Sequence, residues 1–401
     1  MRPFGALISY HEAKEIIDRH IQPIIHAQAV PIDSAVNRVL AEDLIAKMNV
    51  PPFNRAAMDG YAVKAKDTFG AGQFKPKLFK IVGEIHAGEN PVKKIKSGEC
   101  MQISTGAVMP GGADSVMMVE DTEQESTGVK IFKSVTPGAN VGKMGEDIKE
   151  GTVVLKAGIL LDAGKVGVLA SQGLSRVKVF DKPKIAILPT GEEVVPVGKK
   201  LKTAQLYDIN SHTISALVSA NGGTPVRIGI AGDKTEELRA AIKEALKCDI
   251  VVLSGGSSVG ERDLLVDVID MWGEILFHGV QVKPGKPTIF AIIEGKPLMG
   301  MPGYPTSCLI NSYLFLVPAI RKMAHLPPRK GDTVKAKLAR SVPGSTGRRQ
   351  FLTVKLAGDE AVSVFKESGA ITSIAEADGY IEIPENIDML EKGDTVTVTL
   401  F

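Results

Sequence analysis

The stretch DIVVLSGGSSVGERD, residues 249–263, joins a short apolar run to a turn of glycines and serines. Residues 250–253 are apolar and mostly β-branched, which is typical of a strand buried on both faces of a parallel sheet. Residues 254–260 have mostly small side chains, so several backbone N–H groups can converge on an anion. The carboxylates of Glu261 and Asp263 follow immediately. This order predicts a site for a phosphate and a cation, while a plain tight turn is the alternative.

Strand and helix patterns alternate on both sides of this stretch. We expect strands at 185–188, 226–230, 250–253, 280–282, 288–292 and 298–301, and helices at 210–220, 236–246, 264–272 and 306–323. This alternation predicts a doubly wound α/β domain at 181–326, in which ligands bind at the carboxyl ends of the strands. The loops that follow the strands should therefore share one rim of the domain.

The flanking sequence is mainly β-like. Between residues 51 and 140, β-rich runs at 78–85, 99–103, 115–119 and 128–132 alternate with glycine turns, which predicts a mainly β domain. Residues 1–50 and 141–180 are expected to form a discontinuous linking domain of helical and extended segments, with helices at 9–17, 33–42 and 162–172. A last set of β-like runs predicts a barrel-like C-terminal β domain at 327–401.

The composition is that of a multidomain globular protein. The chain has 401 residues, more than the roughly 250–300 at which one core usually splits into domains. Its 48 basic and 46 acidic residues nearly balance, which offers no broad electrostatic surface to nucleic acid. No apolar stretch approaches the roughly 18–20 residues of a membrane span. The three cysteines are far apart without metal-binding spacing, so we expect reduced thiols in a cytoplasmic protein.

Several short motifs follow one another along the chain. They are AMDGYAV (57–63), TGA (105–107), GED (145–147), TGEE (190–193), SGGSSVG (254–260), KPGKP (283–287) and PGYP (302–305). In this order they resemble the motifs of the molybdopterin molybdotransferases, the MoeA family, which is related to the gephyrin E domain. The resemblance covers essentially the whole chain, and MDGYAV, SGGxS and KPGKP are highly specific in combination.

The resemblance implies an elongated, four-domain homodimer that acts as a transferase in molybdenum cofactor biosynthesis. Such proteins take molybdopterin activated as an adenylate, together with molybdate and a divalent cation such as Mg²⁺. They insert molybdenum into the dithiolene and release AMP. Their site lies between the α/β domain of one subunit and the Asp-Gly-Tyr β domain of the other. We also consider contact with a molybdopterin adenylyltransferase, and expect none with nucleic acid or a membrane.

The chemistry of the residue types agrees with this implication. Molybdate and the pterin phosphate are anions, so they need N–H donors and cations. The substrate-binding candidates are Ser254, Gly255, Gly256, Ser257, Ser258, Lys283, Lys286, Pro302, Pro305, Ser307 and Ser368. Breaking a pyrophosphate needs charge neutralisation by a metal, and the candidate ligands are Glu193, Asp233 and Asp263. The catalytic candidates are Asp59, Thr105, Asp147, Glu193 and Asp263.

Plainer interpretations stay open for several of these residues. Lys283 and Lys286 also suit a solvated loop. Asp233 follows a glycine at a strand end and also suits a helix cap. Asp147 also suits a role at a domain junction, and Ser368 suits an ordinary serine-glycine turn.

Tyr304 departs from the family pattern, which usually has Asn between the Gly and the Pro of this motif. A tyrosine is larger and stacks where an asparagine hydrogen-bonds, so the placement of the pterin and the bonding of this loop stay open. Pro305 and the hydroxyls of Thr306 and Ser307 still open a helix, so we expect an anion site at its N-terminus.

Two other functions stay open. Molybdopterin adenylyltransferases share the α/β module but lack the flanking β domains, so residues 56–63 and the C-terminal β domain argue against that activity. The other is a scaffold, because gephyrin-type domains also bind receptor tails. Nothing in the chain resembles a long linker to a second enzymatic module.

Overall fold

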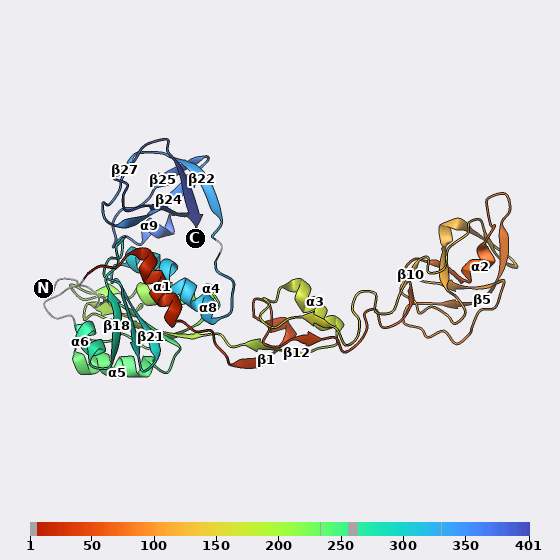
Figure 1. Cartoon of the computed structure of the whole chain (residues 1–401), viewed down its shortest axis with the longest axis horizontal. Helices are drawn as coiled ribbons and strands as arrows, with labels where there is room; N and C mark the ends of the chain where they lie inside the picture. The colour runs from red at the N-terminus through yellow and green to blue at the C-terminus, as the bar shows by residue number, and fades with distance from the viewer. Residues whose placement is uncertain (1–5, 233, 256–263, 330) are drawn as a thin grey trace. The chain divides into compact units, whose positions relative to one another are not determined.

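The computed structural model describes residues 6–232, 234–255, 264–329 and 331–401 (Figure 1). It divides into two units. Unit 1 comprises Met1–Gln28, Asn37–Val39 and Val179–Phe401, and unit 2 comprises Ala29–Val36 and Leu40–Lys178. Strands β1 (Ala27–Pro31) and β12 (Arg176–Phe180) pair where the chain passes between the units.

Unit 1 is built on a six-stranded sheet with the order β16-β13-β17-β21-β20-β18. Its strands are β13 (Lys184–Pro189), β16 (Thr224–Arg227), β17 (Ile250–Ser254), β18 (Gly273–His278), β20 (Ile289–Ile293) and β21 (Lys296–Met301). Strands β16, β13, β17 and β21 are parallel, whereas β20 runs antiparallel to β21 and β18 antiparallel to β20. The predicted α/β domain is confirmed, and β18 is a strand that the sequence analysis missed.

Helices cover both faces of this sheet (Figure 1). Along β17, Ile250 and Val252 pack in one core, and Val251 and Leu253 pack in the other. The first core also contains side chains of α1, α4, α7 and α8, and the second those of α5 and α6. The helices are α1 (Tyr10–His20), α4 (Asn210–Ala220), α5 (Thr235–Ala245), α6 (Leu264–Asp270), α7 (Pro305–Asn311) and α8 (Val317–Met323). Because successive strand side chains point to opposite faces, an unbroken apolar run suits this doubly wound arrangement.

The helix expected at 306–323 contains an irregular turn. Between α7 and α8, Ser312–Leu316 form one π-helical segment. Pro318 follows two residues after this segment and has no N–H to donate, so a regular α-helix cannot pass this point unperturbed. Asn311, the last residue of α7, is buried and bonds to the loop at 283–287.

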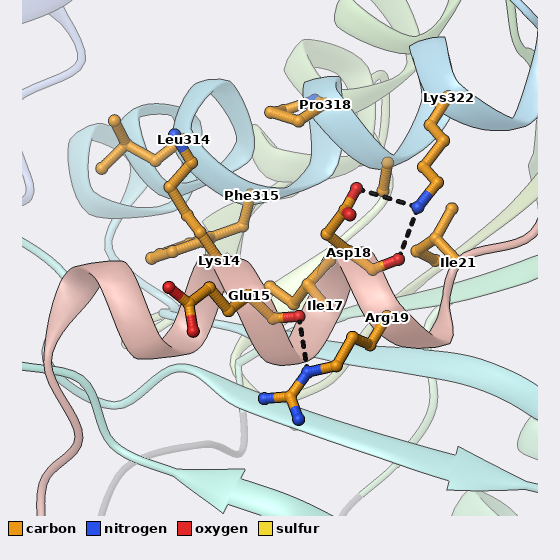
Figure 2. Close-up of a pocket in the computed structure, with 11 residues that line it drawn as sticks. Lys14, Glu15, Ile17, Asp18, Arg19, Ile21, Leu314, Phe315, Pro318 and Lys322 are labelled. Carbon is orange, nitrogen blue, oxygen red and sulfur yellow. Dashed lines mark hydrogen bonds and ion pairs between the residues drawn. The ribbon is translucent and has the colours of Figure 1, made fainter.

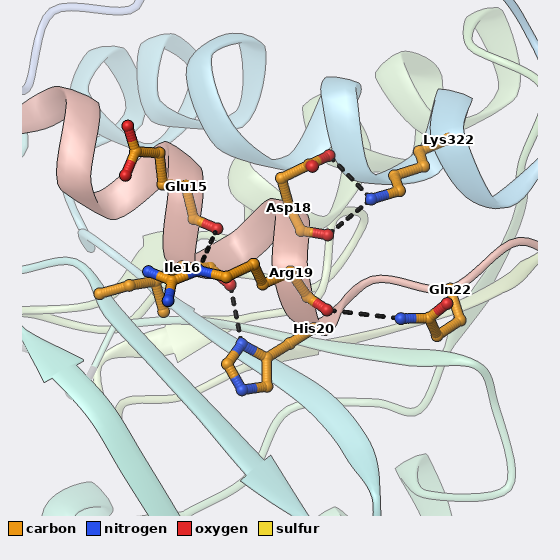
Figure 3. A network of polar contacts seen from close by, with 7 residues as sticks. All are labelled: Glu15, Ile16, Asp18, Arg19, His20, Gln22 and Lys322. Carbon is orange, nitrogen blue, oxygen red and sulfur yellow. Dashed lines mark hydrogen bonds and ion pairs between the residues drawn. The ribbon is translucent and has the colours of Figure 1, made fainter.

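Helix α1 packs against α8 (Figure 2). Ser9 caps α1 as predicted, because its hydroxyl accepts the Glu12 N–H at 3.1 Å. The Lys322 ammonium donates to the backbone carbonyl of Asp18 at 2.6 Å and to its Oδ1 at 2.9 Å (Figure 3). Apolar packing and this polar contact together hold α1 on the first core.

The C-terminal part of unit 1 is a closed β-barrel. Its strands are β22 (Thr333–Leu338), β24 (Arg349–Ala357), β25 (Glu360–Ser363), β26 (Gly379–Ile383) and β28 (Thr395–Leu400), and the pairing of β24 with β26 closes the ring. The shorter elements here are β23 (Val342–Pro343), α9 (Thr372–Ala375) and β27 (Met389–Leu390). The predicted barrel-like domain is confirmed. Strand β19 (Val282–Lys283) pairs with β24 instead of the central sheet, which sets Lys283 beside Gln350.

Unit 2 contains a six-stranded sheet with the order β7-β4-β6-β5-β9-β8. Its strands are β4 (Gly60–Val63), β5 (Lys77–Ile85), β6 (Glu99–Ile103), β7 (Ser115–Met118), β8 (Thr122–Glu125) and β9 (Gly128–Ile131). The other elements are β2 (Leu44–Ile45), β3 (Arg55–Ala56), α2 (Ala65–Thr68), β10 (Val141–Gly142), β11 (Val153–Leu155) and α3 (Ala163–Ser171), with 3-10 turns at Ile32–Ser34 and Val119–Asp121. The predicted β-rich runs correspond to β5, β6, β7 and β9.

Of the two helices predicted in the linking segments of unit 2, one is present and the other is not. Helix α3 begins after Asp162, whose side chain accepts the Lys165 N–H at 3.0 Å, so this prediction is confirmed. The helix expected at 33–42 is wrong. A 3-10 turn ends at Ser34, and Asn37 has a φ of 62°, a left-handed conformation that an α-helix cannot contain. The predicted domain boundaries stay a prediction.

Candidate functional site

Three strands of the unit 1 sheet end side by side. In register, Pro189 of β13 lies opposite Ser254 of β17, and Ser254 lies opposite Met301 of β21. The Thr190 N–H donates to the Ser254 carbonyl at 3.0 Å, and the Gly255 N–H donates to the Met301 carbonyl at 3.2 Å. We call the starts of the loops after β13, β17 and β21 the rim. This is the edge at which a doubly wound sheet binds ligands.

The turn after β17 brings two backbones into close contact. Gly255 has a φ of +96°, and a Cβ at this position would lie 2.7 Å from the Thr190 carbonyl oxygen. Next to it, the side-chain oxygens of Thr190, Ser254 and Asn210 are buried without a hydrogen-bond partner among the described residues. Buried polar atoms almost always have a partner, so an unpaired group at this edge indicates a place where a ligand can bond.

Several candidates lie outside the described residues: Gly256, Ser257, Ser258, Asp233 and Asp263. Their roles in anion and metal binding stay predictions. Within the described ranges, no group of three or more His, Cys, Asp or Glu side chains is placed to hold a metal ion. Asp233 and Asp263, two of the three carboxylates proposed as ligands, lie outside those ranges.

The KPGKP loop lies at the same end of the sheet as the rim. Strand β20 is antiparallel to β21 with Ile289 opposite Gly300, so the residues just before β20 lie level with the carboxyl end of β21. Lys283 and Lys286 of this loop are half-buried. The fold therefore carries both lysines to the end of the sheet where the unpaired hydroxyls lie.

Asn311 fixes the backbone of the KPGKP loop. Its Nδ2 donates to the Gly285 carbonyl at 2.8 Å and to Thr288 Oγ1 at 2.6 Å, and the Thr288 hydroxyl donates to the same carbonyl at 2.9 Å. Gly285 has a φ of +101°, and a Cβ there would lie 2.1 Å from Asn311 Nδ2. Sequence reasoning missed Asn311, because nothing in its helical run distinguishes it from a solvent-facing polar residue.

The loop after β21 connects the rim to the barrel. The Asn210 Nδ2 donates to the Gly303 carbonyl at 2.8 Å. On the other side, the Thr306 N–H donates to the Ser368 carbonyl at 3.0 Å, and the Thr306 hydroxyl donates to the Ala370 carbonyl at 2.8 Å. Both Thr306 donors are thus taken by the barrel loop. The expectation that they serve an anion at the N-terminus of α7 is wrong for this residue.

The other candidates of this region lie close to that loop: Pro302 is buried, Pro305 begins α7 and Ser307 is 3% exposed. Ser368 is half-buried and reaches the loop through its carbonyl. The neighbouring Ser373 is fully buried, and its hydroxyl accepts the Lys366 N–H at 3.0 Å. Ser373 therefore stabilises the barrel loop that carries Ser368.

Glu193 folds back over the start of its loop. A Cβ at Gly191, which has a φ of +129°, would lie 2.6 Å from Glu193 Oε2, so the carboxylate rests against this glycine. The parallel pair of β14 (Val194–Val195) and β15 (Leu206–Tyr207) follows and anchors the loop. Glu193 is exposed, which leaves its carboxylate accessible to a cation.

A cavity of about 890 Å³ opens beside the rim, between the loops after β13 and β16. Asp208 on its wall is 8% exposed and accepts the Ser211 N–H of the first turn of α4 at 2.9 Å. Also on the wall, Arg227 Nη1 lies 3.3 Å from both ring nitrogens of His212. The volume falls in the range of small-molecule sites, roughly 300–1,000 Å³. Sequence reasoning missed His212 and Arg227, because neither belongs to a turn motif.

Unit 2 brings Asp59 and Thr105 together. The N–H and the hydroxyl of Thr105 donate to Asp59 Oδ1 at 2.6 and 3.0 Å. Both bonds favour the ionised form and lower the pKa of Asp59, the backbone N–H contributing most. The next residue is Gly60, and a larger residue would not fit there, because a Cβ would lie 1.8 Å from the Met117 carbonyl oxygen. The motif thus exposes an oriented carboxylate on a turn.

Asp147 is exposed on a separate turn of unit 2, and its N–H donates to the Val50 carbonyl at 3.0 Å. Gly145 before it has a φ of +69°, and a Cβ there would lie 2.7 Å from Asn49 Oδ1. Within the described part of the chain, no hydrogen bond joins the Asp147 carboxylate to Asp59. The structure therefore pairs Asp59 with Thr105 but does not link Asp147 to them.

A second cavity, of about 450 Å³, lies between α1 and the helical segment that ends in α8 (Figure 2). Ile17, Leu314 and Phe315 line it, with charged side chains such as Lys14 and Asp18 at its edge. None of the candidate residues named above lines it.

In the described ranges, every helix is too short or too polar to span a membrane.

Family models match most of the chain. Residues 8–173 match the MoeA N-terminal region (domain I and II), residues 186–322 match a model described as "Probable molybdopterin binding domain", and residues 335–401 match the MoeA C-terminal region (domain IV).

Individual relatives agree with these matches. A molybdopterin molybdenumtransferase of Staphylococcus aureus is 33% identical over 399 residues, covering 96% of this chain and 94% of that protein. One of Staphylococcus epidermidis is 32% identical over 401 residues, covering 98% and 95%. The crystal structure of a molybdopterin biosynthesis MoeA protein from Pyrococcus horikosii has a TM-score of 0.88 and 42% identity, covering 98% of this chain and 99% of that one. These matches confirm the resemblance that the motifs indicated, and the chain belongs to the MoeA family.

Proposed function

We propose that this chain is a transferase that inserts molybdenum into adenylylated molybdopterin and releases AMP, which yields the molybdenum cofactor. Its staphylococcal relatives carry the name molybdopterin molybdenumtransferase. The observation that carries the proposal is the rim of unit 1. There the oxygens of Thr190, Ser254 and Asn210 are buried and unpaired among the described residues, at the end of the sheet that also carries the lysines of the KPGKP loop.

The substrates explain why this edge needs cations and donors. Molybdate is a dianion and the pterin carries a phosphate, so both must be met by ammonium groups, hydroxyls and backbone N–H groups. We assign the charge to Lys283 and Lys286. Asn311 holds their loop through bonds of 2.8 Å to the Gly285 carbonyl and 2.6 Å to the Thr288 hydroxyl, so the loop needs little further ordering when the anion binds. Ser254 supplies a hydroxyl at the same end of the sheet, while the Gly255 N–H is held by the Met301 carbonyl, and the remaining substrate-binding candidates extend the same surface.

The cavity beside the rim supports a place for the adenylate half of the substrate. It adjoins the loop that carries Glu193, and its volume of about 890 Å³ accommodates a nucleotide. Arg227 on its wall supplies a guanidinium, which suits a phosphate because its donors match two oxygens at once.

A divalent cation such as Mg²⁺ is the cofactor that we propose. Glu193 would hold it together with Asp233 and Asp263. The donor set suits a hard cation, since Glu193 is an accessible carboxylate and the nearby oxygens of Thr190 and Ser254 are unpaired among the described residues. When bound, the cation neutralises phosphate charge as the bond to AMP breaks.

Asp59 is the carboxylate that we propose as catalytic, with Thr105 orienting it and Asp147 as a further candidate. The two bonds from Thr105 orient Asp59 and lower its pKa, which favours its ionised form. In the homodimer that we propose, these residues of one copy serve the rim of the other.

A molybdopterin adenylyltransferase must supply the activated substrate, and we propose that it contacts this chain. Free, buried cysteines support a cytoplasmic location.

The test is to incubate the purified chain with adenylylated molybdopterin, Mg²⁺ and molybdate, and to follow both AMP release and formation of the molybdenum-loaded cofactor. We expect AMP release that depends on molybdate. Formation of adenylylated molybdopterin from molybdopterin and ATP would instead indicate an adenylyltransferase. Binding without turnover of either substrate would indicate a scaffold.

A further inference from the structure

Tyr304 stands at the rim with most of its side chain in solvent. It directly precedes α7 and is 67% exposed. Its ring faces the barrel loop, because Cδ1 and Cε1 lie 3.5 and 3.8 Å from the position that a Cβ of Gly369 would occupy. Among the described residues, its hydroxyl has no hydrogen bond, so the contact with Gly369 is made by the ring alone.

The barrel loop is held on both sides of this contact. The Thr306 N–H bonds to the Ser368 carbonyl at 3.0 Å, and the Thr306 hydroxyl bonds to the Ala370 carbonyl at 2.8 Å. Gly369 lies between these two carbonyls and faces the Tyr304 ring. Three consecutive residues of the barrel loop therefore rest on the segment that opens α7.

The same segment touches the turn after β17. A Cβ at Gly303 would lie 3.5 Å from the Gly255 Cα, and the Gly303 carbonyl accepts the Asn210 Nδ2 at 2.8 Å. Gly255 directly follows β17, and the side-chain oxygen of Asn210 is buried and unpaired among the described residues. Residues 303–306 thus connect Gly255, the first residue after β17, with the barrel loop that carries Ser368.

We propose that Tyr304 is a positioning residue that sets the Ser368 loop against the Gly255 turn for substrate binding. The part of this inference that concerns substrate binding rests on the proposed function. Thr306 fixes two carbonyls of the loop, whereas Gly369 between them is exposed, faces the Tyr304 ring and has no side chain of its own to limit its motion. The ring faces Gly369 without using its hydroxyl. A phenylalanine at this position should therefore keep the loop in place, whereas an alanine or an asparagine should not.

The experiment compares the full-length chain with Tyr304→Phe, Tyr304→Ala and Tyr304→Asn. Amide hydrogen exchange is followed by mass spectrometry in peptides covering 367–373, where the Ala370 N–H bonds to the Glu367 carbonyl at 3.0 Å. We expect faster exchange in the Ala and Asn variants and wild-type exchange in the Phe variant. Phe74→Ala is the matched control, because Phe74 is a fully exposed aromatic residue of unit 2.

Kinetics give the second measurement. We expect the KM for adenylylated molybdopterin to rise between about twofold and tenfold in Tyr304→Ala, with kcat nearly unchanged, as for the loss of one aromatic contact. Unchanged exchange in the Ala variant would overturn the proposal, and so would faster exchange with an unchanged KM. If no variant and not even the wild type releases AMP, the proposed function fails, while the exchange data still decide whether Tyr304 orders the loop.

Discussion

Thr105 directs both of its donors, the backbone N–H and the hydroxyl, at a single oxygen of Asp59, with distances of 2.6 and 3.0 Å. Within the described residues, the second oxygen of Asp59 accepts no hydrogen bond. The carboxylate is therefore oriented and ionised, and one oxygen stays available to a substrate or a cation. An aspartate that only forms part of a hairpin turn does not need two donors from Thr105 on one oxygen, so this geometry favours a functional role for Asp59.

Replacing Asp59 by alanine or asparagine should leave the fold intact and remove molybdenum insertion. The side chain is exposed, so its loss does not disturb the core, whereas loss of a general base, the role open to an ionised carboxylate, typically costs about 10²–10⁴-fold in rate. AMP release and circular dichroism measure the two effects. Asp67→Asn is the control, because the Asp67 carboxylate also holds a nearby loop, accepting from Ser97 Oγ at 3.0 Å and Gly98 N–H at 3.1 Å. Normal turnover by a folded Asp59 variant would refute its role.

Thr105→Val should raise the pKa of Asp59 part of the way to its usual value. The substitution removes the hydroxyl bond but keeps the backbone N–H, which has the larger effect. Because the folded pKa is depressed, the stabilisation is present above the unfolded pKa and is lost as pH falls through the folded pKa. In the variant, this stabilisation should be smaller, and its loss should be complete at a higher pH. Carbon NMR titration of the Asp59 carboxyl between about pH 2 and pH 7 measures the shift, and an identical titration in both proteins would contradict it.

Lys283→Gln and Lys286→Gln should each raise the KM for molybdate by about tenfold or more. A hydrogen bond to a charged group contributes about 1.5–3 kcal/mol, and about 1.4 kcal/mol corresponds to a factor of ten. Lys335→Gln on β22 is the control, since this exposed lysine lies on a barrel strand. If the KPGKP loop is only a solvated loop, all three variants will have the same KM.

Gly60→Ala should destabilise unit 2, whereas Gly167→Ala should not. A Cβ at Gly60 would lie 1.8 Å from the Met117 carbonyl oxygen, and crowding in a packed sheet costs about 1–3 kcal/mol or more. Gly167 lies within α3, with no atom within 4 Å of the new Cβ, so alanine there should stabilise by about 0.5–1 kcal/mol. Thermal unfolding followed by circular dichroism gives both Tm values. Equal values would show that the glycine of the Asp-Gly-Tyr motif is not needed for packing.

Much of the fold is local in origin and could be predicted from the sequence. The apolar run at 250–253 gives a strand that is buried on both faces, and Ser9 and Asp162 cap helices through bonds to residues three positions away. These features depend on neighbours in the chain, so periodicity and capping rules reach them. The order of the motifs was enough to indicate the family. The same rules failed at 33–42, because the left-handed Asn37 breaks a helix that composition favours.

Only the tertiary structure decided which residues meet. Asn311 lies 26 positions from Gly285, the donors of Thr306 reach Ser368 and Ala370 of the barrel, and the Tyr304 ring faces Gly369. Strand β19 likewise pairs with β24 of the barrel and not with the central sheet. Its own residues do not determine this choice, because a strand pairs with whichever sheet edge the tertiary fold places beside it. Sequence determined the elements and the chemistry they carry, because propensity and periodicity are local. Contacts between distant segments depend on how the packed elements bring them together, and no local pattern encodes that.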